Sequence, residues 1–309
     1  MNVFQSTDQI PCKPYAVAVG MFDGIHLGHR SIIDCLIKEA DTLSVESLVF
    51  TFDIHPRKLL HDAPFKPISS KKEKVDYLRE LGVKNIVFFP FDYEIAEMTA
   101  EDFVKNILVE RFQAKAIVIG DNHRFGNKQM GDHHLLQQMA SRFGFTVHSV
   151  PPVYYENKIV SSTWVRQTIV EGKLRLTREL LNRFYSVRGV VVNGDGRGQK
   201  IGFPTANIEE VETKVPVDGI YSSFVEHEGN IYGAMTYIGY SPTYEGNKRK
   251  IETHIFNFNK KIYGEEIKVS FVARIRDEDR FENQSELKRK LLIDKNITLN
   301  ILADEGIVV

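Results

Sequence analysis

The chain has 309 residues, of which 42% are hydrophobic and 26% charged, and this length favours two domains of ordinary size. Its 40 basic and 41 acidic residues are nearly balanced, so the basic excess typical of nucleic-acid-binding proteins is missing. The two cysteines form no Cys-x-x-Cys pattern, no apolar run is long enough to span a membrane, and there is no signal-peptide pattern. With the balanced charge, these observations predict a cytoplasmic protein without nucleic-acid or membrane partners.

The first part of the chain alternates short apolar runs with helical patterns. The apolar runs, which are typical of buried strands, are residues 15–22, 46–52, 84–90, 115–120 and 145–150. Helical spacing of apolar residues occurs in residues 30–43, 71–81, 99–112 and 132–143. This alternation predicts an α/β domain with a parallel sheet covered by helices on both faces.

The second part of the chain follows a different pattern. Strand-like runs rich in Val, Ile, Tyr and Phe occur at 187–192, 219–226, 230–239, 250–258 and 267–275. They predict a compact antiparallel sheet or barrel, closed by a helix over 285–302 that places Leu287, Leu291 and Leu292 on one face. A short helical bridge over 161–182 joins the parts, so we expect domains of residues 1–182 and 183–309.

A glycine- and histidine-rich motif, G-M-F-D-G-I-H-L-G-H, runs from Gly20 to His29, between a predicted strand and a predicted helix. Backbone N–H groups at such a strand-to-helix turn bind anions, and glycines allow a phosphate to approach closely. His26 and His29 are three residues apart, so their N–H groups can donate to the same phosphate. Two other interpretations are plain polar loop residues and a metal pair with Asp23 as third ligand.

A second motif, G-D-N-H-R-F-G, covers residues 120–126 and also follows a predicted strand. Asn122 and Arg124 are suited to phosphate or flavin polar groups, and Phe125 to contact with an aromatic ring. The alternative interpretation is a glycine-rich turn with a phenylalanine in the core.

A third motif, S-S-T-W-V-R, covers residues 161–166. Hydroxyl groups at a helix start, here Ser161 and Ser162, can cap the helix and also donate to a triphosphate. Arg166 follows about one turn later, where it can form charge-assisted bonds to phosphate oxygens. The alternative is a capping serine followed by a surface arginine.

A glycine-rich segment in the second part runs from Gly194 to Asn207 and ends in G-F-P-T-A-N. Its backbone N–H groups can surround phosphates, although no G-K-[ST] sequence closes it as in a P-loop. The alternative interpretation is an ordinary turn.

These motifs resemble those of known families. F-D-G-I-H-L-G-H is similar to the signature of the nucleotidyltransferase superfamily, and residues 120–126 and 161–166 resemble segments of FMN adenylyltransferases. The segment 194–207 resembles riboflavin kinase, as do Gly219–Tyr221 and the residues around Glu252. Because both sets occur in the expected order over residues 15–300, the chain is identified as a member of the bacterial bifunctional riboflavin kinase/FMN adenylyltransferase family.

For the N-terminal part, the resemblance implies a Rossmann-like nucleotidyltransferase domain that transfers AMP from ATP to FMN, giving FAD and pyrophosphate. It implies that His26 and His29 are catalytic. The ATP-binding residues implied are Gly20, Phe22, Asp23, Gly24, Ser161, Ser162 and Arg166. The flavin-binding residues implied are Asn122, Arg124 and Phe125.

For the C-terminal part, the resemblance implies a β-barrel riboflavin kinase that converts riboflavin and ATP to FMN and ADP. Glu252 stands at the position of the family's catalytic glutamate, where a carboxylate can accept the proton of the ribityl hydroxyl. Mg²⁺ is implied as cofactor. The other residues implied are Thr205 and Asn207 for the metal, Gly202 and Pro204 for ATP, and Arg276 and Phe281 for the flavin. A departure is Tyr237, where the family commonly has Asn.

Two other functions stay open at this stage. One is a chain that retains a single activity with the other site degenerate, and the other is a flavin-binding regulator, acting on RNA, without turnover. The even charge and the presence of His26, His29 and Glu252 speak against the regulator. We expect a monomer or a weak homo-oligomer.

Overall fold

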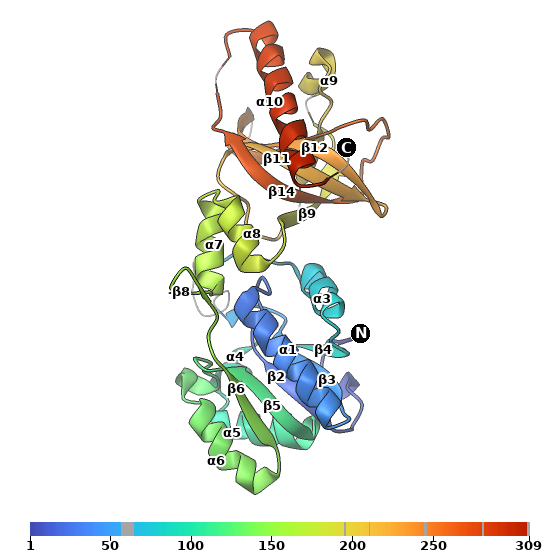
Figure 1. Cartoon of the computed structure of the whole chain (residues 1–309). Helices are drawn as coiled ribbons and strands as arrows, with labels where there is room; N and C mark the ends of the chain where they lie inside the picture. Colours follow the sequence, from blue (N-terminus) through green and yellow to red (C-terminus); the bar gives the residue numbers. More distant parts are fainter. Residues whose placement is uncertain (57–64, 195, 210, 244–245, 280, 308–309) are drawn as a thin grey trace. The chain divides into compact units, whose positions relative to one another are not determined.

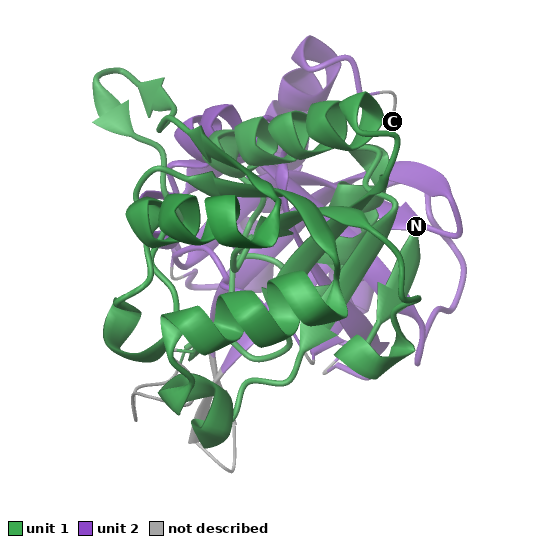
Figure 2. Cartoon of the chain, turned by 90° about the horizontal axis from the view of Figure 1, so that it is seen from below, with its two compact units in different colours: residues 1–162 green, residues 163–309 purple. Residues whose placement is uncertain are grey.

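The computed structural model describes residues 1–56, 65–194, 196–209, 211–243, 246–279 and 281–307, so Asp195 of the glycine-rich segment lies outside the described residues. The chain divides into two compact units, residues 1–162 and 163–309 (Figure 2). This division places the helical bridge almost entirely in the second unit, whereas the predicted domain boundary at 182/183 places it in the first. No described helix is both long and apolar enough to cross a bilayer.

A six-stranded parallel sheet forms the centre of the first unit, in the order β1-β4-β3-β2-β5-β6. Its strands are β1 (Asn2–Phe4), β2 (Tyr15–Val19), β3 (Glu46–Phe52), β4 (Asn85–Phe89), β5 (Ala114–Gly120) and β6 (Thr146–Val150). The parallel sheet and the five strands from β2 to β6 confirm the sequence-based prediction. A small antiparallel hairpin, β7 (Tyr154–Tyr155) and β8 (Lys158–Ile159), lies outside this sheet.

Helices cover both faces of the sheet, as the alternating pattern predicts (Figure 1). They are η1 (Thr7–Gln9), α1 (Leu27–Thr42), α3 (Lys71–Glu80), α4 (Tyr93–Glu97), α5 (Ala100–Asp102), the π-helix η2 (Phe103–Arg111), η3 (Asn127–Gln129) and α6 (His133–Phe143). In β2, Ala16 and Ala18 pack in the cluster of α1 and α3, while Val17 and Val19 pack in the cluster of η2 and α6. Successive strand residues point to opposite faces, so β2 is buried on both sides.

The strand order reverses direction at β2. The chain continues from β2 to β3 and β4 on one side and then places β5 on the other side. In open α/β sheets, the carboxyl ends of the strands at such a reversal form the ligand crevice. Gly20 directly follows β2, and Gly120 is the last residue of β5. The segments that begin at these two glycines therefore lie at the position expected for a binding site.

A closed antiparallel barrel forms the second unit, with the strand order β10-β13-β12-β11-β14-β9. Its strands are β9 (Tyr185–Val192), β10 (Ala206–Glu209), β11 (Gly219–His227), β12 (Asn230–Thr243), β13 (Gly246–Ile255) and β14 (Glu266–Arg276). Its helices are α7 (Ser162–Val170, whose first residue belongs to the first unit), α8 (Leu174–Leu181), α9 (Arg197–Ile201) and α10 (Gln284–Asp304). Barrel and closing helix confirm the predicted fold class.

The buried face of α10 differs from the prediction. Leu287 and Leu291 line a cavity, but Leu292 is 48% exposed, so the three leucines do not share one buried face. The fully buried positions are Asp294, Thr298 and Leu302, spaced four residues apart. The prediction was wrong because it searched for apolar residues, whereas α10 buries a carboxylate that has a charged partner on β14.

Candidate active sites

A cavity of about 450 Å³ lies at the strand reversal of the first unit. Gly20, Asn122, Arg124 and Phe125, all predicted from the sequence, line it together. Its remaining lining residues are Val19, Met21, Phe50, Phe52, Pro56, Phe91, Ile95, Ala96, Met98, Phe103, His123, Gly126, Lys128 and Gln129. The many aromatic side chains give the cavity flat apolar walls, which suit a planar ring system.

The segment after β5 is fixed by pairing with itself. Phe125 and Gly131 exchange two backbone hydrogen bonds of 3.1 and 2.8 Å, and the Phe125 ring packs 5.7 Å from the Phe103 ring. A Cβ at Gly131 would lie 2.6 Å from the Phe125 ring, so this position requires glycine. The pairing holds Phe125 in the cavity wall, where its ring also packs against the hydrophobic core of the unit.

His123 is a lining residue that the sequence analysis did not assign a role. Burial and the neighbouring Arg124 guanidinium lower the pKa of its imidazole to about 4, so the ring is neutral at neutral pH. Its Nε2 is buried without a hydrogen-bond partner among the described residues. A neutral imidazole in this wall can therefore offer one hydrogen bond to a polar edge of a bound ring.

His26 and His29 lie at the start of α1, with their rings stacked 3.7 Å apart at an interplanar angle of 19°. His26 Nδ1 accepts a hydrogen bond of 3.4 Å from the His29 backbone N–H, which makes His26 the N-cap of the helix. Because Nδ1 acts as acceptor, the proton of a neutral His26 ring sits on Nε2, which is therefore the donor atom of this ring. Neither histidine is among the described residues that line the 450 Å³ cavity.

The loop between β2 and α1 is held by its own side chains and backbone. Asp23 Oδ1 accepts hydrogen bonds from the backbone N–H groups of Ile68 (2.8 Å) and Ser69 (3.3 Å). The Ser162 hydroxyl donates to the Asp23 carbonyl at 2.9 Å. Asp23 thus fixes the loop, and the groups of possible metal ligands among the described residues do not include it with the two histidines.

Several residues of this loop have positive φ. Gly24 has a φ of 83°, and Phe22 and Ile25 have values of 47° and 41°. Phe22 is almost completely buried and packs 5.3 Å from the His29 ring. The Phe22 side chain therefore packs against His29 from the core. Any contact between Phe22 and ATP must come from the Phe22 backbone.

The other predicted ATP-binding residues lie on or next to α7. Ser161 and Ser162 are half-buried at its start, and Arg166, also half-buried, follows Ser162 by four residues in the same helix. Residues four apart lie on one helix face, which agrees with the spacing argument made from the sequence.

Lys74 is a buried cation behind the β2–α1 loop that the sequence analysis missed. Its Nζ donates to the Met21 carbonyl at 2.7 Å and lies 3.3 Å from the Thr51 hydroxyl, which also donates to Met21 at 3.1 Å. Burial lowers the pKa of Lys74 to about 8. The sequence signal that could have identified Lys74 is its position four residues before Leu78, on the same, inner face of α3. A lysine on such a face needs a partner, because lysine is rarely buried without one.

We expect the stability of the first unit to depend on the titration of Lys74. Between pH 8 and 10.5 the unfolded chain binds the proton more tightly than the folded chain, so the free energy of unfolding rises with pH. Relative to Lys74→Met, which has no proton to release, wild type gains up to about 3 kcal/mol across this interval. Urea unfolding followed by circular dichroism measures this difference, and a difference that is flat with pH contradicts the prediction.

A second cavity, of about 660 Å³, lies within the second unit. Thr205, Asn207, Glu252, Arg276 and Phe281, all predicted from the sequence, line it. The remaining lining residues are Gly196, Gly198, Lys200, Ile201, Phe203, Ile220, Met235, Tyr237, Tyr240, His254, Glu278, Asp279, Gln284, Leu287 and Leu291. The cavity combines hard oxygen ligands, cations and an apolar wall.

Strand register aligns three of these side chains. Asn207 in β10 pairs with Glu252 in β13, and Glu252 pairs with Tyr237 in β12. Side chains at paired positions of neighbouring strands point to the same face, so the three form a row across the cavity wall. Thr205, two residues before Asn207, lines the same cavity. Glu252 is half-buried in this wall, which argues against the fully exposed position usual for a lone glutamate in an alternating strand.

The glycine-rich segment approaches this row closely. A Cβ at Gly194 would lie 2.0 Å from Asn207 Nδ2, so glycine is required for the loop to reach the amide. The Pro204 carbonyl lies 2.8 Å from His254 Nδ1, which ties the end of the segment to β13. Gly202, with a φ of 87°, and Pro204 are exposed and do not line the cavity, so they shape the turn between lining residues.

The guanidinium of Arg276 is bound mainly to the protein. It forms hydrogen bonds of 2.7 to 3.1 Å with both carboxylate oxygens of Asp294, a residue that is 1% exposed. It also contacts Asp279 at 3.1 Å and lies 5.8 Å from the Phe281 ring centre. Arg276 therefore joins β14, the following segment and α10, and it orients Phe281 beside the cavity.

We expect the two carboxylates bound to Arg276 to contribute very differently to stability. Asp294→Asn leaves a largely buried guanidinium without its buried carboxylate partner and lowers the free energy of unfolding of the second unit by about 3–5 kcal/mol. Asp279→Asn removes a half-exposed partner and costs less than about 1 kcal/mol. Urea unfolding followed by fluorescence of Trp164, the chain's single tryptophan, measures both. Equal effects of the two substitutions contradict the prediction.

Tyr237, where the resemblance to riboflavin kinases implies Asn, lies in β12 and lines the cavity. Its hydroxyl donates a hydrogen bond of 2.6 Å to Glu278, and burial together with this carboxylate raises the pKa of the phenol above its ordinary value. The bond connects β12 to the segment that follows β14 at the cavity.

Comparisons with known proteins follow the same division of the chain. A family model for FAD synthetase matches residues 9–164, and one for riboflavin kinase matches residues 181–302. A bifunctional riboflavin kinase/FMN adenylyltransferase of Buchnera aphidicola subsp. Schizaphis graminum is 34% identical over 289 residues, covering 91% of this chain and 92% of the relative. The chain belongs to the bifunctional riboflavin kinase/FMN adenylyltransferase family. This confirms the resemblance read from the motifs.

Two further similarities cover almost the same length of the chain. The bifunctional riboflavin kinase/FMN adenylyltransferase of Escherichia coli strain K12 is 33% identical over 290 residues, covering 93% of this chain and 92% of the relative. A crystal structure from Streptococcus pneumoniae described as a macrolide-efflux protein has a TM-score of 0.87 at 32% identity, covering 96% of this chain and 98% of the other. The similarity in sequence and in structure thus extends over nearly the whole chain.

The matched ranges divide the predicted residues between the two family parts. The FAD synthetase range contains both histidines, the β2–α1 loop, the lining residues 122–125 and Ser161 and Ser162, while Arg166 lies two residues beyond it. The riboflavin kinase range contains the whole row of Asn207, Glu252 and Tyr237.

Proposed function

We propose that this chain makes FAD from riboflavin in two ATP-dependent steps, with one step in each unit. The observation that carries the proposal is the Asn207–Glu252 row beside Thr205 in the 660 Å³ cavity, together with a separate aromatic cavity at the strand reversal of a nucleotidyltransferase-like sheet. Each cavity is lined by residues of the family motif predicted for that part.

In the second unit, the proposed reaction transfers the γ-phosphoryl group of ATP to the ribityl hydroxyl of riboflavin. The Glu252 carboxylate accepts the hydroxyl proton while the oxygen attacks the γ-phosphorus and ADP departs. The apolar wall with Phe281 receives the flavin ring, and the glycine-rich segment receives the ATP phosphates.

Mg²⁺ is the proposed cofactor of the kinase step. The Thr205 hydroxyl and the Asn207 amide oxygen, which line the same cavity, are hard oxygen ligands of the kind that this ion prefers, so the residues present fit it. Thr205 and Asn207 would hold the ion. When bound, Mg²⁺ neutralises negative charge on the ATP phosphates.

In the first unit, the proposed reaction joins FMN to AMP. An FMN phosphate oxygen attacks the α-phosphorus of ATP, and the bond to pyrophosphate breaks. The nucleophile is already an anion, so no side-chain base is required. The N-terminal amides of α1 and the N–H groups of His26 and His29 stabilise charge on the attacked phosphate. The aromatic cavity holds the flavin ring against Phe125, with Asn122 and Arg124 at its polar groups.

A turnover assay tests the proposed function. We expect purified protein incubated with riboflavin and Mg-ATP to produce FMN first and FAD later, separated by chromatography. FMN alone means that the first unit lacks adenylyltransferase activity. Bound riboflavin without either product supports the alternative of a binding protein and contradicts the proposal.

The setting of the enzyme is also proposed. ATP and flavins are its small-molecule partners, and we infer a cytoplasmic monomer or weak homo-oligomer that binds neither nucleic acid nor membrane. The nearly balanced charge supports the absence of a nucleic-acid partner. We also retain residues 1–182 and 183–309 as the proposed functional domains.

A further inference from the structure

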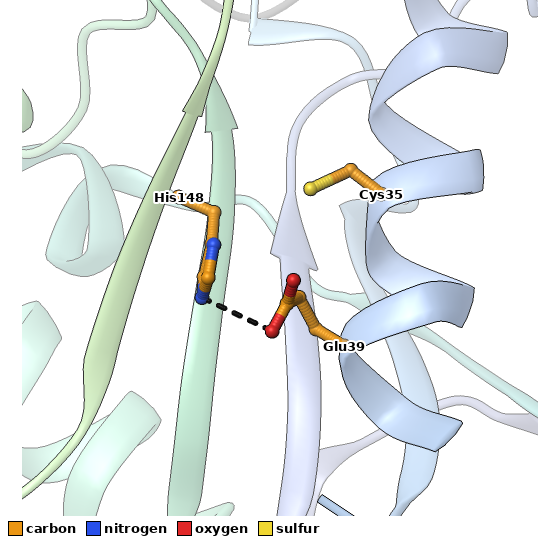
Figure 3. Close-up of side chains that lie close together, drawn as sticks. All are labelled: Cys35, Glu39 and His148. Atoms are coloured by element: carbon orange, nitrogen blue, oxygen red, sulfur yellow. Dashed lines mark ion pairs between the residues drawn. The ribbon is translucent and has the colours of Figure 1, made fainter. Parts of the chain in front are cut away.

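A cluster of metal-ligating side chains lies on the first unit between helix α1 and the edge strand β6. Cys35 and Glu39 are four residues apart on α1, and His148 projects from β6 toward them (Figure 3). One ligand atom of each residue lies within 4.8 Å of the other two. None of the three belongs to the motifs assigned to adenylyl transfer.

The spacing of the imidazole and carboxylate donors fits two ligands of one tetrahedral metal ion. His148 Nε2 and Glu39 Oε2 are 3.3 Å apart. Two ligands bound at about 2.0–2.1 Å at the tetrahedral angle are separated by about 3.3 Å. Cys35 Sγ completes a set of thiolate, imidazole and carboxylate, which favours zinc over magnesium or calcium. His148 Nε2 also lies 3.1 Å from the Thr146 hydroxyl, a contact that metal binding replaces.

The second group of possible ligands in the described chain lacks these properties. His227 Nε2 and Glu265 are 2.6 Å apart, the distance of a direct charge-assisted hydrogen bond rather than of two ligands on one ion. The group contains no cysteine, and both its carboxylates are exposed. Its chemistry therefore gives no preference for zinc.

The environment of Cys35 also disfavours a reactive thiol. Burial and the Glu39 carboxylate raise the pKa of this thiol above its ordinary value. A nucleophilic or redox-sensing cysteine needs the opposite shift, because the thiolate is the reactive form. A divalent cation, in contrast, is attracted by the same carboxylate and stabilises the thiolate by direct coordination.

We propose that Cys35, Glu39 and His148 form a Zn²⁺-binding site. The ion bonds to Sγ of Cys35, to a carboxylate oxygen of Glu39 and to Nε2 of His148, and a water molecule takes the fourth position. The thiol proton passes to the solvent as the Zn–S bond forms, and no electron transfer is involved. His148 and Glu39 have side-chain exposures of 31% and 17%, so the ion can enter from solvent. The bound ion clamps α1 to β6.

Cobalt(II) titration of the full-length protein tests the proposal. Cobalt occupies zinc sites, and a cobalt–thiolate bond gives an intense near-ultraviolet absorption band that oxygen and nitrogen ligands do not give. We expect one equivalent of Co²⁺ to produce the band in wild type and one equivalent of Zn²⁺ to abolish it. We expect Cys35→Ser to lose the band. Cys12→Ser, the matched control at the other, exposed cysteine, retains it.

Two further variants separate ligand loss from misfolding. Glu39→Gln and His148→Ala should weaken Co²⁺ binding, seen as a higher metal concentration at half-maximal absorbance, while circular dichroism stays unchanged. The absence of the band in wild type, or its retention in Cys35→Ser, overturns the proposal. Production of FMN and FAD is assayed separately in metal-free protein with added Mg-ATP, so failure of the zinc site does not count against the proposed function.

Discussion

Replacing Glu252 by Gln should lower the rate of FMN formation by about 10²- to 10⁴-fold, the range that general base catalysis contributes. The isosteric amide keeps the shape of the side chain but cannot accept the proton of the ribityl hydroxyl. Glu252 lines the cavity between Asn207 and Tyr237, so the substitution acts where the hydroxyl must lie. Initial rates of FMN formation from riboflavin and Mg-ATP measure the effect.

The same variant should convert supplied FMN to FAD at the wild-type rate, because the adenylyl step belongs to the other unit. Glu228→Gln is the matched control, since Glu228 is an exposed glutamate of the same barrel with a side chain 62% exposed. We expect this control to make FMN at the wild-type rate. Unchanged FMN formation by Glu252→Gln contradicts the assignment of the base, while loss of both activities indicates misfolding.

The sequence predicted the fold well where the signal is local. The strands from β2 to β6 are short continuous apolar runs. The strands β9 and β11 to β14 are rich in Val, Ile, Tyr and Phe, which favour strands. The three-residue strand β1 and the two-residue strands β7 and β8 are too short to form a pattern. The helix expected over 99–112 is split into α5 and the π-helix η2, a change of hydrogen bonding that side-chain periodicity does not reveal.

From the sequence, each candidate site was predicted as a set of separate motifs, without the arrangement of their side chains in space. Gly20 and Asn122 meet because the strand order reverses at β2, and the row from Asn207 to Tyr237 exists because β13 lies between β10 and β12. Both facts depend on the pairing of distant segments, which the sequence does not encode locally. Family resemblance therefore identified Glu252, whereas its neighbours in space required the structure.

Buried charges were missed for the same reason. Lys74 and Asp294 lie on helices whose charged residues ordinarily face solvent. Lys74 is buried where its Nζ donates to the Met21 carbonyl, and Asp294 is buried where its carboxylate binds the Arg276 guanidinium. Each partner is distant in the chain or on another element, so burial follows from tertiary structure.

Replacing His29 by Ala should lower the rate of FAD formation by about 10²- to 10³-fold, the loss usual when a donor to a developing anion is removed. FMN should accumulate, because the kinase unit is untouched. The His29 ring stacks on His26 and packs against Phe22 at the N-terminus of α1, where donated N–H groups add to the helix amides in stabilising an attacked phosphate. Chromatography of products from riboflavin and Mg-ATP measures both flavins in one sample.

The matched control is His134→Ala, an exposed histidine on α6 that lines no part of the described 450 Å³ cavity. We expect this control to form FAD at the wild-type rate. Loss of the His29 side chain also removes a stacking partner of His26, so His29→Asn, which keeps an N–H donor, distinguishes donation from packing. Partial recovery of the rate in His29→Asn supports donation to the phosphate. Wild-type FAD formation by His29→Ala removes the histidine pair from the mechanism and leaves the α1 amides as the anion-stabilising groups.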